Sequence, residues 1–344
     1  MEYPKFKVCC RCFTFNQAKY ITDTMNGFTM QQTSFPFVCT IVDDASTDGE
    51  QEVIRKYVED NFDFSEGSAV FNKETDYAHI TYAQHKTNKN CYFAVLYLKE
   101  NHYSQKKPKL GYLSEWRDLC EYEALCEGDD YWIDNNKLQM QFNFFENNPD
   151  YTLCFTNAIV HHQDGNRKDK KFVRENADSR DYDGCELYRK WLVPTASIMY
   201  RLIINKTDLY KKAIADKRFI YGDNRLIVIC ASLGKVRFCN IASCVYRRNE
   251  GGVTYRNSCS QKISLIEQHS AYPELFGEKY KKISVNKIVD ISVSGIYRSI
   301  YEKKFQITVF FFMKAIETSL FKTIIYIVAY YPIKHLIKIL KNDF

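Results

Sequence analysis

Short apolar runs alternate with helix-like stretches along the first half of the chain. Residues 6–16 and 35–46 have the pattern of buried strands, and a helical pattern lies between them at 18–32. Strand patterns return at 77–84 and 122–130. Because a strand, a helix and another strand in succession are typical of β-α-β units, the alternation predicts an α/β fold built on a mainly parallel sheet flanked by helices.

The alternation continues beyond residue 130 and then stops. Its later members are helical patterns at 135–150 and 222–234 and strand patterns at 151–160 and 235–248. Thr47 and Glu50 have the spacing of a capping box at the start of an earlier helix. From residue 256 onward the chain has helical patterns and no clear strand. We therefore expect an α/β domain over residues 1–255 and a helical extension over 256–344.

The composition is that of a folded protein with an uneven distribution of charge. The 344 residues are 45% hydrophobic and 26% charged, which excludes the disordered class. Residues 1–255 contain 34 basic and 35 acidic side chains, whereas residues 256–344 contain 14 basic and 7 acidic ones. The whole positive excess therefore belongs to the C-terminal extension.

Thirteen cysteines are scattered along the chain without the rhythm of a disulfide framework, and no charged and apolar leader precedes them. We therefore expect a reducing, cytoplasmic environment. Cys9 and Cys12 have C-x-x-C spacing, but they lie in an apolar run and the chain has no second cysteine pair of this kind. We expect them to be buried as small hydrophobic residues rather than to bind zinc.

Acidic residues gather where two of the predicted strands end. Asp43 and Asp44 close one strand, and Glu127, Asp129 and Asp130 close another. In open parallel sheets, ligands bind outside the carboxyl ends of the strands. Because acids on both sides of a crevice would repel a bare phosphate, a phosphate ligand there requires a divalent cation such as Mg²⁺ or Mn²⁺. The chain lacks the glycine patterns of phosphate loops and dinucleotide-binding folds, so a nucleotide would be bound in another way.

Six motifs follow one another between residues 5 and 255. They read "FTFNQAKYI", "QQTSFPFVCTIVDDASTDG", "ALCEGDDYWIDNNKLQMQ", "PTASIMYR", "YGDNRLIVICASLGKV" and "VYRRNEGGVT". Together they resemble the inverting family 2 glycosyltransferases of bacteria. The resemblance implies a GT-A (Rossmann-like) catalytic domain over residues 1–255. It also implies transfer of a sugar from a nucleotide-diphosphate sugar, with a UDP-sugar favoured, to an acceptor hydroxyl.

By this resemblance, the nucleotide donor lies along the carboxyl edge of the sheet. Phe13, Thr14 and Phe15 would line the base pocket, and Asp44 would contact the base. From the residues alone, Asp43 and Asp44 are better explained as a turn and helix-cap cluster ahead of "STDGE". The resemblance reverses that preference and assigns both to donor binding.

The "EGDD" stretch stands where the family has its D-x-D motif, with Glu127 in place of the leading Asp. The resemblance makes Asp130 a metal ligand, Asp129 a contact to the metal or the ribose, and Glu127 their support. The ion, Mn²⁺ or Mg²⁺, would neutralise charge on the leaving diphosphate. Tyr131 and Trp132 follow at once and indicate a partly buried site.

An inverting transfer needs a general base for the acceptor hydroxyl. Asp223 in "YGDNRL" matches the family's catalytic acid, and a helix N-cap role is compatible with that assignment. Thr195 and Ser197 match the acceptor-side strand, although ordinary strand-edge residues explain them equally well. Trp132 joins them as an expected acceptor contact.

The chain departs from the family in the turn that often contains a His, where Asn249 stands here. A diphosphate contact in this turn would pass to Arg247, to Arg248 or to the backbone of Gly251 and Gly252.

Residues 85–120 match the family poorly and contain an insertion before the strand that ends in "EGDD". The family's basic contact to the donor is therefore not placed by the resemblance. Lys86 and Lys89 are the candidates.

The segment 305–340 is apolar with interspersed lysines. Its longest charge-free run, 323–333, has 11 residues and contains Pro332, which is short of the ~20 residues that span a bilayer. It is expected either to pack on protein, including a homodimer partner, or to lie on an anionic membrane surface. In the second case the protein is peripheral on the inner face of the cytoplasmic membrane and the acceptor is lipid-linked.

The leading hypothesis is a metal-dependent hexosyl- or N-acetylhexosaminyltransferase that acts on a glycan or lipid-linked acceptor in surface polysaccharide or glycoconjugate synthesis. A nucleic acid partner is not expected. A sugar nucleotidyltransferase shares the fold pattern, but it would have a Gly-rich loop where this chain has "CCRCFTFNQ". A non-catalytic glycan-binding or nucleotide-sugar-binding scaffold is the other alternative, against which the retained acids argue.

Overall fold

The computed structural model describes residues 2–165, 167–174, 178–248 and 258–331. The chain divides into two compact units. The first unit comprises Met1–Asp183, Trp191–Lys206 and Leu233–Asn249, and the second comprises Gly184–Lys190, Thr207–Ser232 and Glu250–Phe344. Among the described residues, all strands belong to the first unit, and the second unit is helical.

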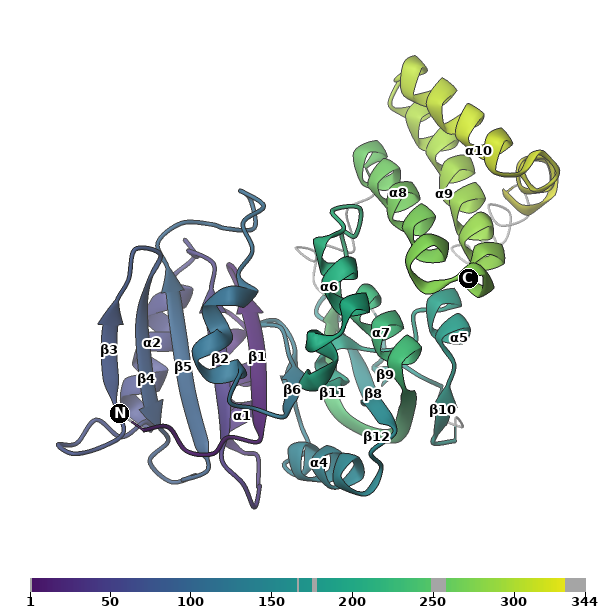
Figure 1. Cartoon of the computed structure of the whole chain (residues 1–344). Coiled ribbons are helices and arrows are strands. Elements are labelled where there is room, and N and C mark those ends of the chain that lie inside the picture. The colour runs from purple at the N-terminus through teal and green to yellow at the C-terminus, as the bar shows by residue number, and fades with distance from the viewer. Residues whose placement is uncertain (1, 166, 175–177, 249–257, 332–344) are drawn as a thin grey trace. The chain divides into compact units, whose positions relative to one another are not determined.

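The first unit is built on one sheet with twelve strands among the described residues. They are β1 (Val8–Thr14), β2 (Phe37–Asp43), β3 (Phe71–Glu74), β4 (Ala78–Gln84), β5 (Cys91–Leu98), β6 (Tyr122–Leu125), β7 (Tyr131–Trp132), β8 (Tyr151–His162), β9 (Lys170–Lys171), β10 (Arg180–Tyr182), β11 (Met199–Arg201) and β12 (Lys235–Arg248). Their order is β10-β12-β8-β11-β6-β1-β2-β5-β4-β3, with β7 beside β12 and β9 beside β8 (Figure 1). The run β6-β1-β2-β5 is parallel throughout, as is the pair β8 and β12. The predicted α/β fold with a mainly parallel sheet is therefore confirmed.

The sequence pattern missed β5, although this strand lies inside the sheet. All eight of its residues are buried, and it pairs in parallel with β2 and antiparallel with β4. A strand that is buried on both faces has a continuous apolar run instead of an alternating one, and such a run is a weak signal. The strand predicted at 77–84 is β4, and its antiparallel pairing with β5 departs from the parallel order.

Helices cover both faces of this sheet. They are α1 (Ile21–Thr29), α2 (Glu50–Asn61), α3 (Ser114–Arg117) and α4 (Lys137–Asn147). Since successive side chains of a strand point to opposite faces, Cys12 packs with Met25 of α1 and Ile54 of α2, while Cys9 packs with Trp116 of α3. Cys9 and Cys12 are fully buried with free thiols, which confirms the expectation that they serve as small hydrophobic residues.

The capping box predicted from Thr47 and Glu50 is wrong. The N-cap residue of α2 is Gly49, whose φ of 89° suits a glycine. Glycine has no side chain, so it forms no capping hydrogen bond. The Glu50 carboxylate instead accepts hydrogen bonds from the Gln17 backbone at 2.9 Å and from the Ser46 hydroxyl at 2.8 Å. Glu50 therefore stabilises the segment that follows β1.

The second unit consists of packed helices. They are α5 (Gly184–Arg189), α6 (Asp208–Ala215), α7 (Gly222–Leu233), α8 (Cys259–Phe276), α9 (Lys281–Tyr301) and α10 (Phe305–Ile325). The helices α8, α9 and α10 pack around a cluster of Cys259, Ile266, Ile288 and Phe311. The predicted helical C-terminal region is therefore confirmed, whereas the functional boundary at residue 255 stays a prediction. No helix among the described residues has both the length and the apolar character needed to span a membrane.

A buried ion pair joins β6 to the neighbouring elements of the first unit. Glu123 is fully buried and accepts hydrogen bonds from Arg117 Nε at 3.0 Å and Nη2 at 2.9 Å, and from the Tyr200 hydroxyl. Arg11 Nε lies 3.1 Å from the same carboxylate. Although burial alone would raise the pKa of Glu123, Arg11 and Arg117 hold it below its ordinary value. The carboxylate is therefore ionised and paired in the folded protein.

Glu123→Gln should lower the free energy of unfolding by about 3 kcal/mol, because two guanidinium groups would keep their buried charge beside a neutral amide. Chemical denaturation at neutral pH measures the effect. The difference from the wild type should shrink as pH falls through the lowered pKa, since the wild-type carboxylate then loses its charge as well. The matched control is Glu121→Gln, which breaks an exposed pair with Lys7 and should cost less than about 1 kcal/mol. Equal effects of the two substitutions would contradict a stabilising role for the buried pair.

Candidate active site

The parallel register brings three chain segments to one edge of the sheet in the first unit. β1 pairs with β2 so that Thr14 lies opposite Asp43, and it pairs with β6 so that Arg11 lies opposite Leu125. The residues that follow β1, β2 and β6 therefore lie at the same edge, which we call the carboxyl edge. In open parallel sheets this is the edge where ligands bind.

Asp44, the first residue after β2, is fully buried and surrounded by donors. The backbone N–H groups of His102 and Tyr103 donate to its carboxylate at 2.8 and 3.0 Å, and the Lys109 ammonium donates at 2.6 Å. Lys109 is a candidate site residue that the sequence did not reveal. It lies 65 residues from its partner, within an insertion, and its only signal was the basic character of "SQKKPKLGY".

Asp43 and Glu50 are also fully buried, and both serve the turn after β2. Asp43 accepts hydrogen bonds from the Ser46 N–H at 3.2 Å and from the Gln51 side-chain amide at 2.5 Å. Glu50 accepts one from the Thr14 hydroxyl, which ties the turn to the end of β1. Burial raises the pKa of both carboxyls above their ordinary values, since these hydrogen bonds compensate only part of the lost hydration.

Asp130 is 3% exposed and is held by β12. Its Oδ1 accepts the backbone N–H of Arg247 at 2.8 Å, and its carbonyl accepts the Thr24 hydroxyl at 2.6 Å. The Arg247 guanidinium donates to the Asp129 carbonyl at 3.1 Å and pairs with Asp23. Burial raises the pKa of the Asp130 carboxyl well above its usual range, and the nearby Asp129 adds to the rise.

Glu127 and Asp129 are half-buried on either side of Gly128. A Cβ at Gly128 would collide with the Thr14 side chain, so this loop lies directly against the end of β1. Carboxylate oxygens of this kind suit Mg²⁺ or Mn²⁺. Within the described part of the chain, however, no three acidic, His or Cys side chains gather closely enough to hold a metal ion. The residues present therefore fit an ion that one or two carboxylates share with the phosphates of a ligand.

The rings of Phe13 and Phe15 and the guanidinium of Arg248 lie on the solvent side of the carboxyl edge. Phe13 is half-buried, with Arg11 at 4.9 Å and Lys109 at 5.3 Å from its ring centroid. Phe15 is exposed, as is Arg248 at the end of β12. Apolar rings bordered by cations suit a ligand that combines a planar group with negative charge.

Trp132 and Ser197 lie in the interior of the first unit. The Trp132 indole is 2% exposed, and its N–H donates to the Ala196 carbonyl at 2.7 Å. Ser197 is fully buried, and its hydroxyl donates to the Pro194 carbonyl at 2.6 Å. Thr195 is half-buried. Of these three residues predicted to contact an acceptor, the structure assigns Trp132 and Ser197 to packing and leaves Thr195 accessible.

Asp223 lies in the first turn of α7, in the second unit. Its side chain is half-buried, and its Oδ1 lies 2.7 Å from the backbone N–H of Asn224, which donates to it. A carboxylate at this position is favoured by the positive end of the helix dipole. The geometry therefore supplies an accessible acid at a helix start.

The structure does not bring Lys86 and Lys89 to the carboxyl edge. Both precede β5 and therefore lie at the opposite edge, where Lys86 donates to carbonyl groups at the end of α2. Asn249, Gly251 and Gly252, named for the turn after β12, lie outside the described residues.

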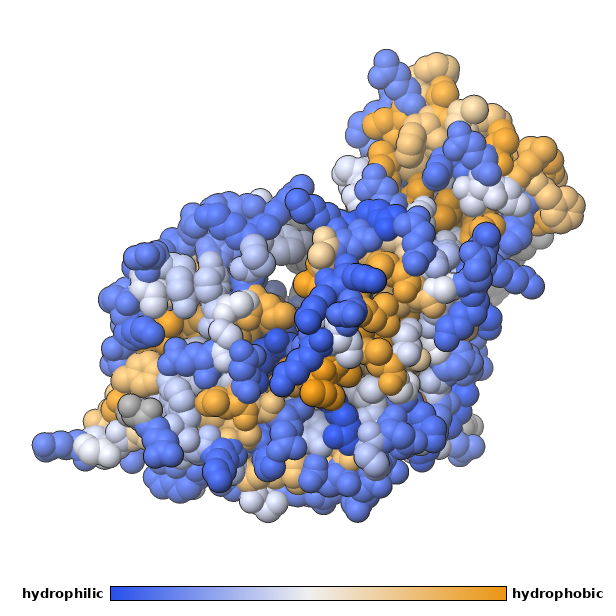
Figure 2. Space-filling view, in the orientation of Figure 1, coloured by the Kyte–Doolittle hydropathy of each residue, from blue (hydrophilic) through white to orange (hydrophobic). Residues whose placement is uncertain are grey.

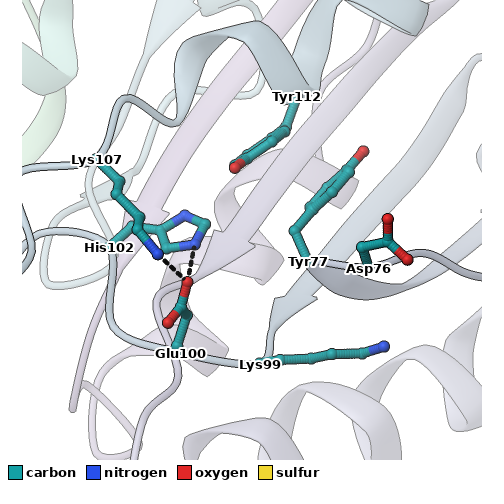
Figure 3. Close-up of a pocket in the computed structure, with 7 residues that line it drawn as sticks. All are labelled: Asp76, Tyr77, Lys99, Glu100, His102, Lys107 and Tyr112. Atoms are coloured by element: carbon teal, nitrogen blue, oxygen red, sulfur yellow. Dashed lines mark hydrogen bonds and ion pairs between the residues drawn. The ribbon is translucent and has the colours of Figure 1, made fainter.

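A pocket of about 580 Å³ opens where β5 ends. It is lined by Asp76, Tyr77, Lys99, Glu100, His102, Lys107 and Tyr112. Figure 3 shows Glu100 paired with both His102 and Lys107. It also shows the rings of Tyr77 and Tyr112 beside each other, and their centroids are 3.9 Å apart. The loop after β5, which contributes His102 to this pocket, also supplies the backbone N–H groups of His102 and Tyr103 that donate to Asp44. The pocket therefore adjoins the carboxyl edge.

No protein-family model matches the chain. Uncharacterized proteins of Mycobacterium tuberculosis and Mycobacterium bovis are 26% identical to it over 245 residues, which is 70% of this chain and 58% of theirs. The chain thus spans less than two thirds of the length of these curated relatives.

Solved structures similar to this chain include TarS of S. aureus. TarS 1–349 in complex with UDP has a TM-score of 0.53 at 13% identity, over 93% of this chain and 91% of TarS 1–349. The complex with UDP-GlcNAc has a TM-score of 0.50 at 12% identity over the same shares. A further TarS structure, of which 55% is covered, has a TM-score of 0.52 over 93% of this chain at 13% identity. At these identities the likeness shows the fold, which is the GT-A fold of glycosyltransferases.

At a pH above the raised pKa of Asp130, Asp130→Asn should raise the free energy of unfolding of the metal-free protein by about 1 kcal/mol or more, because the amide keeps an acceptor for the Arg247 N–H and carries no buried charge. The gain should shrink as pH falls through the raised pKa, where the wild-type carboxyl becomes neutral as well. Urea denaturation in EDTA over a series of pH values measures it. The exposed Asp118→Asn should have no effect. A loss of stability in Asp130→Asn at every pH of the series would mean that the surroundings fully compensate the charge.

Proposed function

We propose that this protein is an inverting family 2 glycosyltransferase that moves a sugar from a nucleotide-diphosphate sugar to a hydroxyl of a glycan or lipid-linked acceptor. The observation that carries the proposal is the gathering of Asp44 and the loop from Glu127 to Asp130 at the carboxyl edge of a GT-A sheet. The TarS complexes with UDP and UDP-GlcNAc support a UDP-sugar as the donor. Surface polysaccharide or glycoconjugate synthesis is the corresponding process.

The donor base is proposed to bind beside the end of β1. Phe13 and Phe15 offer ring faces for stacking, whereas Thr14, which stands between them in the sequence, is 4% exposed and donates its hydroxyl to Glu50. Asp44 would accept an N–H of the base, and that hydrogen bond would compete with the one from Lys109. An ammonium released from Asp44 would then be available to the donor phosphates. This exchange couples recognition of the base to neutralisation of the phosphates.

The donor diphosphate is proposed to bind at the EGDD loop. Asp130 and Asp129 would hold Mn²⁺ or Mg²⁺ together with the diphosphate, and Glu127 would support them. The ion would supply Lewis-acid stabilisation of the leaving diphosphate. The Arg247 backbone N–H keeps Asp130 in place, and the exposed Arg248 is available to a phosphate oxygen.

Asp223 is proposed as the general base that removes the proton of the acceptor hydroxyl. Its match to the "YGDNRL" motif and its accessible position at the start of α7 support this role. Thr195 is the proposed acceptor-side contact, because its side chain is accessible.

Calorimetry with UDP-, GDP- and TDP-sugars should detect binding of one donor class that depends on Mn²⁺. Asp130→Ala should weaken this binding by at least about tenfold, because it removes a carboxylate that the ion would share with the diphosphate. The control Asp118→Ala removes an exposed acid that precedes β6 at the opposite edge of the sheet, and it should leave the affinity unchanged. Absence of metal-dependent binding of any nucleotide sugar would remove the basis for the transferase.

Asp223→Asn should retain donor binding and lower the transfer rate by about 100-fold or more, because Asn cannot accept the proton of the acceptor hydroxyl. Asn is about as good as Asp at a helix start, so the substitution separates the chemical role from the structural one. Sugar release and transfer assays with the donor found by calorimetry measure the effect. Asp208→Asn, which changes the exposed acid in the first turn of α6, should transfer at the wild-type rate. Normal transfer by Asp223→Asn would assign the base to another group.

A further inference from the structure

The exposed side of α10 is apolar. Among the residues of this helix, all of which the structure describes, eleven are exposed and nine of these are apolar. Phe305, Phe312, Phe321 and Ile324 are examples, and Phe305 is 79% exposed. We call these nine apolar residues the outer face of α10; they lie on two helical segments, because Ser319 has non-helical φ and ψ angles of -169° and 102° and divides α10 at a kink. Figure 2 shows hydrophobic residues gathered over the C-terminal helices. An exposed apolar surface of this extent marks a binding surface.

The outer face is not needed to pack the helix within its own unit. The opposite side of α10 contributes Phe311 and Ala315, which are both fully buried. Phe311 packs against α9 so closely that a Cβ at Gly295 would lie 2.6 Å from its ring. A helix that only packs on a protein has one apolar stripe and a polar opposite side. Since α10 is apolar on both sides, packing within its own helical cluster does not account for its outer face.

The charges around the outer face indicate what its partner is. Lys303 and Lys304 are exposed immediately before α10, and Lys304 pairs with Glu302 at 2.5 Å. Lys314 and Lys322 are half-buried along the helix, whose one acid is Glu317. The region 256–344 as a whole carries 14 basic and 7 acidic residues. A second copy of the chain would bring two such positive regions together, whereas an anionic surface would attract them.

We propose that α10 lies on the surface of a membrane that contains anionic lipid, with its outer face in the boundary between headgroups and acyl chains. Lys303 and Lys304 contact the lipid phosphates at the start of the helix. Interfacial helices combine an apolar face with basic residues in this manner, and long lysine side chains reach the headgroups while their stems stay in apolar surroundings. The proposal does not depend on the transferase activity.

Co-sedimentation of the full chain with vesicles tests the proposal. One set of vesicles contains phosphatidylcholine with about 30 mol % phosphatidylglycerol, and the other contains phosphatidylcholine alone. At about 0.15 M salt we expect binding to the anionic vesicles that is at least about tenfold tighter than binding to the neutral ones. Phe312→Asp combined with Phe321→Asp should weaken binding by at least about tenfold.

Two further variants make the outcome decisive. Ile203→Asp changes a residue of the first unit that is 59% exposed, and it should leave vesicle binding unchanged. Lys303→Glu combined with Lys304→Glu leaves the outer face intact and should remove the preference for anionic vesicles. Near-UV circular dichroism establishes that each variant is folded. If the phenylalanine variant does not fold, the loss of preference for anionic vesicles in the lysine variant tests the proposal instead.

Three results would overturn the proposal. The first is no binding of the wild type to anionic vesicles, and the second is equal binding to both kinds of vesicle. The third is a concentration-dependent dimer in sedimentation equilibrium that the phenylalanine substitutions dissociate while vesicle binding stays the same. That result would assign the outer face to a second copy of the chain.

Discussion

The burial of carboxylates at the carboxyl edge is the constraint on which the first unit depends. Asp43, Asp44 and Glu50 are fully buried and Asp130 is 3% exposed, although an ionised carboxylate in the interior is costly unless donors replace its lost hydration. Asp44 has a cation, and the others accept N–H or O–H groups. The pKa values of Asp43, Glu50 and Asp130 are nevertheless raised by burial, so the compensation is incomplete. Acids retained at such a cost are typical of functional sites.

The same acids determine how distant segments come together. Asp44 is bound by the loop after β5, Glu50 by the end of β1, and Asp130 by the last part of β12. Each contact joins residues that are 36 to 117 positions apart in the chain. The carboxyl edge is therefore organised around its carboxylates. Lys109, which donates to Asp44, also lies over the Phe13 ring.

Most features that depend on neighbours in the sequence could be predicted, with β5 as the exception, and those that depend on distant neighbours could not. The strand expected at 235–248 coincides with β12, because its pattern is local. The acids after β2 and β6 were located by the same logic of strand ends. Lys109 was missed because its partner lies across an insertion. Glu50 was assigned to a capping box, because the sequence spacing from Thr47 does not show that its carboxylate is buried against the end of β1. Trp132 was expected to contact the acceptor, because its place after the acidic loop indicates a partly buried aromatic but does not show that its ring faces the interior.

Folded proteins ordinarily bury apolar side chains and expose charged ones, and the two units depart from this rule in opposite ways. The first unit buries carboxylates where apolar side chains would pack at lower cost, and the second exposes phenylalanines such as Phe305 and Phe321 where polar side chains would be better hydrated. The exposed phenylalanines do not help the isolated chain to fold, and the buried carboxylates are held at a cost that their hydrogen-bond donors offset only in part. Sequences usually agree with their folds at every level and break the pattern where a binding partner gains from it. The carboxyl edge and the outer face of α10 are thus the two departures from this agreement on which the proposed donor site and the proposed membrane contact rest.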